Sequence, residues 1–300
     1  MEKSSIEPIT SIINSEISQD HKLRVPLLQE IGEYFQGTVV SFFATHSHWQ
    51  GSLNDSDASM LKDLLTSIGR TSNLLLIIDS PGGDPHSAER IIKTCRECAS
   101  DEFLTLVPDK AKSAATMICL GSDKIIMTPE SELGPIDVQI PWGDKLIPAH
   151  VIIKSYEELM EKCTNTPTDQ RVEPFLHQLQ AYNAAQVEHL RLVRDLAREI
   201  AEKVLKDGML KKSKRIPKEI LRNFLDPEAL KTHGRPIFYS DIKKIDTRES
   251  LKIQCIAHDL PVFHKIHEYH RRAASHMAAN NLAKLCESVR TSFASPIMGG

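Results

Sequence analysis

The chain has few aromatic residues, no strong charge of either sign and no long apolar segment. Aromatic residues make up 5% of its 300 residues, and the formal net charge is −3 at pH 7. Without aromatic platforms or a basic field, nucleic acid is not an expected partner. No apolar run approaches the roughly eighteen residues of a membrane span, and the polar start lacks the basic and apolar regions of a signal peptide. We therefore expect a cytoplasmic protein with no membrane span.

The cysteines and histidines do not indicate a disulfide framework or a metal site. The six cysteines are expected to be reduced thiols in a chain of this composition. Cys95 and Cys98 have redox or zinc spacing, but a second cysteine pair is missing, and one pair supplies only two ligands. His46 and His48 form a His-x-His pair, again with no third ligand nearby in the sequence. We expect no cofactor and no metal.

The most informative stretch runs from residue 74 to residue 137. It opens with an apolar run at 74–78 that does not alternate with polar residues, which predicts a strand buried on both faces. The run ends at Ser80-Pro81-Gly82-Gly83. Two adjacent glycines allow a sharp turn whose N–H groups point outward, with no side chain in the way of a ligand. Such a turn can supply an oxyanion hole from the main chain alone.

Ser113 stands between a strand-like run at 103–107 and a helix that begins with small residues, starting at Ala114. The free N–H groups at the start of a helix, and the positive end of its dipole, favour a developing negative charge. A serine hydroxyl in this position can act as a nucleophile when a neighbouring base accepts its proton. Ser113 is therefore the candidate nucleophile.

These motifs resemble the crotonase-like superfamily of serine peptidases, which includes the Clp proteases and signal peptide peptidase A. The serine dehydrogenase proteinase family is the nearest match. The shared features follow one another in the same order: the turn at 80–83, the serine at 113, the strand at 121–125 and the loop at 129–137. The resemblance also selects the serine, because Asp123 lies ten residues after Ser113, as these families require. The similarity covers about residues 40–240.

The resemblance implies a serine endopeptidase that forms an acyl-enzyme on Ser113. The oxyanion would be held by the N–H groups of the Gly82-Gly83 turn and of Ala114. It also implies an α/β fold of the crotonase/ClpP type, a parallel sheet of repeated strand-helix units with added helices at both ends. A peptide or protein would be the substrate, the chain would form a homo-oligomer, and a regulatory protein partner is possible.

Two arrangements could supply the base, and the sequence leaves both open. In the first, Lys154 is the base, as in the signal-peptide-peptidase-like relatives; it lies forty-one residues after Ser113. A neutral lysine needs an apolar pocket, and Ile152 and Ile153 beside it could supply part of one. In the second, His233 is the base and Asp137 orients it, because histidine needs no large pKa shift near neutral pH.

The second arrangement departs from the Clp proteases, which use the order serine, histidine, aspartate. Where their histidine would fall, this chain has Asp137 and Val138. His150 is a weaker alternative histidine.

Periodicity outside the central stretch predicts the remaining organisation. A strand at 38–44 and a helix at 55–68 extend the alternation of strands and helices, which indicates crossover units and a largely parallel sheet. The longest helical pattern runs over 174–210, and further helices are expected over 241–290. The expected divisions are an N-terminal helical arm (1–30), a Clp/crotonase-like domain (31–245) and a C-terminal helical extension with a disordered tail (246–300).

Two other functions are compatible with this scaffold. Crotonases use paired main-chain donors to polarise a thioester, so an acyl-CoA-processing protein is one alternative. The other is a non-catalytic scaffold, which would bind a partner through the long helices at 150–210 and 241–290.

Overall fold

The computed structural model describes residues 9–15, 20–142, 145–167, 171–213, 215–226, 235–246 and 250–299. The elements follow one another along the chain as α1 (Ile9–Ser15), α2 (His21–Phe35), β1 (Thr38–Ala44), η1 (Trp49–Gly51), α3 (Asp55–Ile68), β2 (Thr71–Asp79), α4 (Pro85–Cys98), β3 (Ala99–Val107), β4 (Lys110–Ala111), α5 (Ala114–Leu120), β5 (Lys124–Met127), β6 (Glu132–Leu133), β7 (Gln139–Trp142), β8 (Lys145–Pro148), α6 (Ala149–Asn165), α7 (Glu173–Leu179), α8 (Ala184–Asp207), α9 (Lys218–Leu225), β9 (Ile237–Phe238), α11 (Tyr239–Ile245), β10 (Ile253–Cys255), α12 (Pro261–Ala279), β11 (Leu282–Ser288) and β12 (Ser292–Pro296).

A seven-stranded, largely parallel sheet forms the centre of the molecule, in the order β10-β5-β3-β2-β1-β11-β12. The five strands from β10 to β1 pair in parallel, and β11 and β12 pair antiparallel. The parallel strands are joined by helical crossovers, as the alternation of patterns predicts. The mixed α/β fold class expected from the sequence is confirmed.

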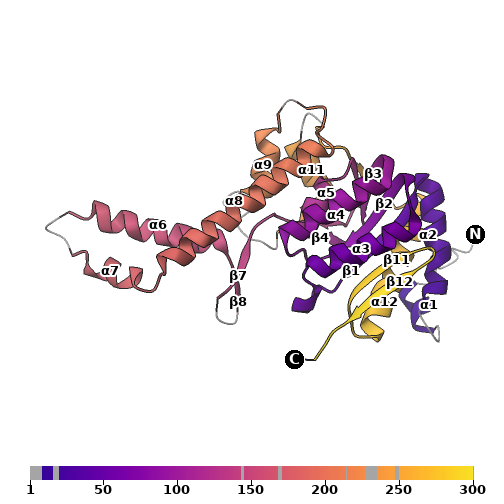
Figure 1. The fold of residues 1–300 in the computed structure, drawn as a ribbon, viewed down its shortest axis with the longest axis horizontal. Helices are drawn as coiled ribbons and strands as arrows, with labels where there is room; N and C mark the ends of the chain where they lie inside the picture. The colour runs from indigo at the N-terminus through magenta and orange to yellow at the C-terminus, as the bar shows by residue number, and fades with distance from the viewer. Residues whose placement is uncertain are drawn as a thin grey trace, which may run out of the picture.

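Helices cover both faces of this sheet (Figure 1). Alternate residues of β2 enter different cores: Leu76 and Ile78 pack with α3, α4 and α5, whereas Leu75 and Ile77 pack with α2 and α12. This two-sided burial is why the β2 segment reads as an unbroken apolar run.

A helical arm formed by α6, α7 and part of α8 extends away from the sheet (Figure 1). Its own small core contains Ile152 and Ile153 of α6 with Val187 and Leu190 of α8. The sequence predicts one helical pattern over 174–210, but the structure has two helices, α7 and α8. The reason is local: the Asn183 side chain accepts hydrogen bonds from the N–H groups at the start of α8 and begins a new helix there.

The C-terminal segment differs from the expected helical extension with a disordered tail. It adds three strands to the central sheet, and β11 pairs directly with β1 over Val40–Ala44 and Lys284–Ser288. All of β11 is buried, but Lys284 and Glu287 interrupt its apolar pattern. The hydrophobic pattern of the sequence therefore does not predict a strand there. Lys284 forms an ion pair with Asp57, and Glu287 forms one with Arg24; both partners are buried.

The predicted N-terminal helical pattern corresponds to α1 and α2 in the described part of residues 1–30. Leu28 and Ile31 of α2 are fully buried against the sheet, in the same core as α12. None of the helices that the structure describes is both long enough and apolar enough to cross a membrane.

Replacing Glu287 with glutamine tests how much its buried ion pair with Arg24 stabilises the fold. Arg24 donates two hydrogen bonds to Glu287, of 2.6 and 2.9 Å, and both side chains are inaccessible to solvent. Loss of one partner of a buried pair leaves the other charge uncompensated, so we expect Glu287→Gln to lower the free energy of unfolding by about 3 kcal/mol at neutral pH. Urea denaturation measures this change.

The pH dependence of that loss follows from the Glu287 pKa. Burial raises it, but the hydrogen bonds and charge of Arg24 outweigh burial and hold the pKa below its ordinary value of 4.5. The stabilisation is therefore present above pH 4.5 and is lost as the pH falls through the folded-state pKa. The difference in the free energy of unfolding between wild type and Glu287→Gln should narrow below pH 4.5. A difference that stays constant with pH would contradict the lowered Glu287 pKa. Glu89→Gln, which breaks the exposed pair with Lys203, is the control and should lower the free energy of unfolding far less than Glu287→Gln does.

Candidate functional site

The carboxyl end of β2 is joined to the loop that carries Ser113. The Ser80 N–H donates to the Lys110 carbonyl, and the Lys112 N–H donates to the Ser80 carbonyl, both at 3.0 Å. Lys110 and Ala111 form β4, which leads directly through Lys112 to Ser113. Two backbone hydrogen bonds therefore fix the glycine turn beside the candidate nucleophile.

The double glycine is required by close approach on both sides of the turn. Gly82 has φ +84°, and a Cβ there would lie 2.3 Å from the Lys112 carbonyl oxygen and 2.9 Å from the Ser113 Cβ. Gly83 has φ +154°, and a Cβ there would lie 2.4 Å from the Leu53 backbone nitrogen. No other residue fits at either position without moving the backbone. The glycine turn is thus packed directly on the serine loop.

Ser113 precedes the first turn of α5 in an unusual conformation, with φ 48° and ψ −117°. A positive φ is uncommon for a residue with a side chain, and such conformations cluster at functional sites. The side chain is half-buried, and within the described residues its Oγ has no hydrogen-bond partner. The hydroxyl is therefore held in place by the backbone alone.

Two N–H groups beside Ser113 are available to a ligand. Within the described ranges, neither the Gly83 nor the Ala114 N–H donates to an acceptor of the chain. The Ala114 nitrogen lies 2.8 Å from where a Gly82 Cβ would be, so the helix start and the turn are in contact. The sequence predicts both as donors to the oxyanion, and their role stays a prediction. The N–H of Gly82, the third predicted donor, instead donates to Ser80 Oγ at 3.1 Å.

Lys112, which flanks the nucleophile, is held by a partner. Its Nζ lies 2.7 Å from Glu132 Oε1, and the side chain is largely buried. The charge of Lys112 is therefore already compensated, which makes it a poor source of charge for an oxyanion.

The first candidate base, Lys154, lies on α6 with its side chain exposed. Ile152 and Ile153, which were expected to surround it with apolar groups, are instead buried in the core between α6 and α8. Among the described residues, these two isoleucines thus do not form an apolar pocket around Lys154. Its role as base stays a prediction.

The second candidate arrangement is described only in part, because His233 lies outside the described residues. The structure places His150 beside Asp137, with Nδ1 and Oδ2 3.2 Å apart but not aligned for a hydrogen bond. Burial raises the Asp137 pKa, and the adjacent imidazole opposes that shift. His150 and Lys154 are four residues apart on α6, so they share a helix face about 6 Å apart along its axis.

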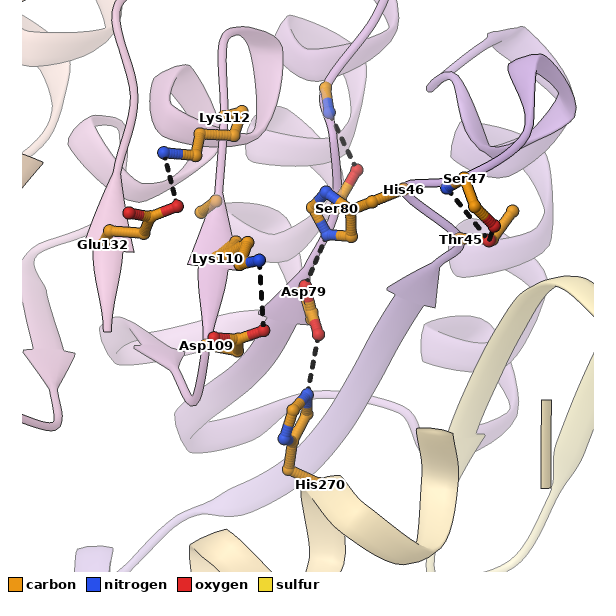
Figure 2. Close-up of polar contacts among 12 residues, drawn as sticks. Thr45, His46, Ser47, Asp79, Ser80, Asp109, Lys110, Lys112, Glu132 and His270 are labelled. Atoms are coloured by element: carbon orange, nitrogen blue, oxygen red, sulfur yellow. Dashed lines mark hydrogen bonds and ion pairs between the residues drawn. The ribbon is translucent and has the colours of Figure 1, made fainter. Parts of the chain in front are cut away.

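A separate polar cluster lies next to the glycine turn, and the sequence does not predict it. Asp79, the last residue of β2, accepts from His46 at 2.7 Å through Oδ1 and from His270 at 2.8 Å through Oδ2. Figure 2 shows the two rings approaching the Asp79 carboxylate from opposite sides. Burial raises the pKa of Asp79, but these two hydrogen bonds outweigh it, and the pKa is below its ordinary value.

Of the cluster residues, only His46 stands out in the sequence, as part of the His-x-His pair. His270 lies in the 241–290 region where the sequence predicts only further helices. In the structure its helix, α12, is packed on the sheet, and the His270 side chain is 12% exposed. Ligand atoms of Asp79, Asp109 and His270 all lie within 4.8 Å of one another. Among the described residues, this group could hold a metal ion.

A family model of ClpP-like SDH-type serine proteinases matches residues 52–245. The match covers more than half of the chain and includes the glycine turn, Ser113, Asp137 and Lys154. The chain belongs to this family. The family membership that the sequence motifs predict is thus confirmed.

Two uncharacterized proteins of Methanocaldococcus jannaschii are similar to parts of this chain. One is 39% identical over 83 residues, which is 28% of this chain and 27% of that protein. The other is 32% identical over 90 residues, 30% of this chain and 29% of that protein. The chain thus matches less than a third of the length of either relative.

Among solved structures, the ClpP protease catalytic domain from Plasmodium falciparum is similar at 12% identity. The comparison covers 82% of this chain and 97% of that chain, with a TM-score of 0.42.

Substituting Gly82 with alanine tests the close approach of the turn to the serine loop. Gly69 provides a matched control, since its φ of +81° is similar but nothing lies within 4 Å of its Cβ position. Gly69→Ala should lower the free energy of unfolding by about 1 kcal/mol, from backbone strain alone. Gly82→Ala should lower it by about 1 to 3 kcal/mol more, because the backbone must also move. Equal losses in urea denaturation would show that the contact is absent.

Proposed function

We propose that this SDH-type proteinase hydrolyses peptide bonds through an acyl-enzyme on Ser113. The observation that carries the proposal is the packing of the Gly82-Gly83 turn on the serine loop. That packing puts a half-buried hydroxyl at a helix start next to main-chain donors that have no acceptor within the described chain. Membership of a serine proteinase family supports the same conclusion.

In the proposed mechanism, a base takes the proton from Ser113 Oγ as the oxygen attacks the carbonyl carbon of the substrate. The N–H groups of Gly83 and Ala114 hold the resulting oxyanion, and each such donor is typically worth about 2.7 to 4 kcal/mol of transition-state stabilisation. The base returns the proton to the leaving amine, and water then hydrolyses the acyl-enzyme. We expect the peptide to bind in extended form, as an added strand beside the glycine turn.

The base is either Lys154 or a histidine oriented by Asp137. We favour Lys154, on the interval that it shares with the serine-lysine relatives. Because Lys154 is exposed and its neighbouring isoleucines are buried elsewhere, the apolar surroundings that it needs would come from bound substrate or from a second copy of the chain.

The surface of the arm supports the expectation of a homo-oligomer. Large apolar side chains are exposed on all three of its helices: Val151 and Met160 on α6, Leu176 on α7 and Leu192 on α8. Exposed apolar residues that gather on one projecting element are typical of an association surface. Sedimentation velocity can measure the resulting oligomeric state.

Ser113→Ala provides the direct test of the nucleophile. We expect wild type to react with a fluorophosphonate probe at Ser113 and to cleave peptides, and the folded Ser113→Ala variant to do neither. Ser122→Ala is a control, because Ser122 is fully buried and its hydroxyl donates to the Cys119 carbonyl. Equal labelling and cleavage by Ser113→Ala would exclude the proposal. Partner binding that needs no turnover would then favour the scaffold alternative.

The two bases make different predictions for peptide hydrolysis. If Lys154 is the base, Lys154→Ala should lower kcat/KM by about 10²- to 10⁴-fold, while His150→Gln and His233→Gln retain most of the activity. If a histidine is the base, one of these two variants should show that loss instead, while Lys154→Ala retains most of the activity. Glu158→Ala, another exposed position on α6, is the control for changes to the arm.

A further inference from the structure

The cluster around Asp79 brings together side chains from four separate parts of the chain. His46 follows β1, Asp79 ends β2, Asp109 follows β3, and His270 lies on α12. The first three come from the carboxyl ends of adjacent parallel strands, the edge of an α/β sheet at which ligands usually bind. The cluster is therefore placed by the topology of the sheet, on residues that the proposed mechanism does not use.

The donor atoms are of the kinds that a divalent transition metal prefers. The cluster offers imidazole nitrogen and carboxylate oxygen, the mixed set that binds zinc and related ions. Ligand atoms of Asp79, Asp109 and His270 lie within 4.8 Å of one another. A tetrahedral ion with bonds of about 2.0 Å keeps its ligand atoms roughly 3.3 Å apart. The 2.8 Å separation of His270 Nε2 and Asp79 Oδ2 is thus within a few tenths of an ångström of that spacing.

The charges of the cluster also favour a cation. Two carboxylates, those of Asp79 and Asp109, lie close enough to share one ion. Lys110 compensates Asp109 only weakly, because its Nζ is 3.9 Å from Asp109 Oδ2 and both side chains are more than 40% exposed. Figure 2 shows Asp109 and Lys110 beside Asp79 and His270, and the side chains of the latter two are each only 12% exposed. A bound cation would offset the repulsion between the two carboxylates.

We propose that Asp79, Asp109 and His270 bind one divalent transition metal ion, with Zn²⁺ as the representative ligand. The ion takes the position of the proton that Asp79 and His270 share. His46 remains hydrogen-bonded to the other oxygen of Asp79 and orients the carboxylate, as outer residues of metal sites do.

The location of the site gives the ion a structural consequence. Asp79 immediately precedes Ser80, and Asp109 immediately precedes Lys110, which are the residues whose backbones pair beside the nucleophile loop. An ion bound by both carboxylates holds the carboxyl ends of β2 and β3 together beside the nucleophile loop. It therefore stabilises the segments that place Gly82 against Ser113.

The test is a titration of the full chain with Zn²⁺ alone after removal of metals with a chelator. We expect one ion per chain by calorimetry, with a dissociation constant in the micromolar range or tighter. Zinc at a hundredfold excess over that constant should raise the Tm by about 5 °C. All measurements are made in the Ser113→Ala background, so the result does not depend on peptidase activity.

Variants of the cluster decide the assignment. Asp109→Asn and His270→Gln should each weaken zinc binding by at least about a hundredfold, and His46→Gln by about tenfold. Asp109 is half-exposed, so its variant keeps the test valid if a change at His270 unfolds the chain. His258→Gln, which removes an exposed histidine paired with Glu130, should leave zinc binding unchanged.

Two results would overturn the site. One is no zinc binding tighter than about millimolar by the folded chain. The other is zinc binding of equal affinity by the folded Asp109→Asn variant and the parent chain. In either case, the cluster serves only as a hydrogen-bonded connection between α12 and the sheet.

Discussion

The arrangement of the site depends on one backbone contact, the pairing of Ser80 with Lys110 and Lys112. This pairing brings together the end of β2 and the loop before α5, two segments about thirty residues apart in the sequence. Once they are joined, Gly82 has to lie against Ser113, and only a residue without a side chain fits there. The glycines, the strained serine and the free N–H groups are all consequences of this approach.

The sequence predicts this part of the molecule well because its signals are local. The unbroken apolar run of β2, the double glycine and the small residues of α5 each indicate their structure within a few positions. The same applies to α3, whose bounds at Asp55 and Ile68 agree with the helix expected over 55–68. Here burial, turn chemistry and propensity all point to the same structure.

The sequence does not predict features that depend on distant partners. β11 carries Lys284 and Glu287 inside a buried strand, which is possible only because Asp57 and Arg24 neutralise them from far along the chain. Asp79 and His46 are separated by 33 residues and Asp79 and His270 by 191, so no local motif reveals that they meet. For the same reason, the sequence does not show that Asp79, Asp109 and His270 lie together.

The antiparallel pairing of β1 with β11 has a consequence for how the chain folds. β1 is synthesised before its partner, which follows some 240 residues later. The partner strand on one edge of β1, the counter-ion of Arg24 and the second histidine of Asp79 are therefore all missing until residues 270–288 have been made. Contacts over such distances in sequence are slow to form, so the nascent domain exposes an unpaired strand edge during synthesis. The three strands between residues 253 and 296 thus belong to the central sheet and can join it only after the other four have been synthesised.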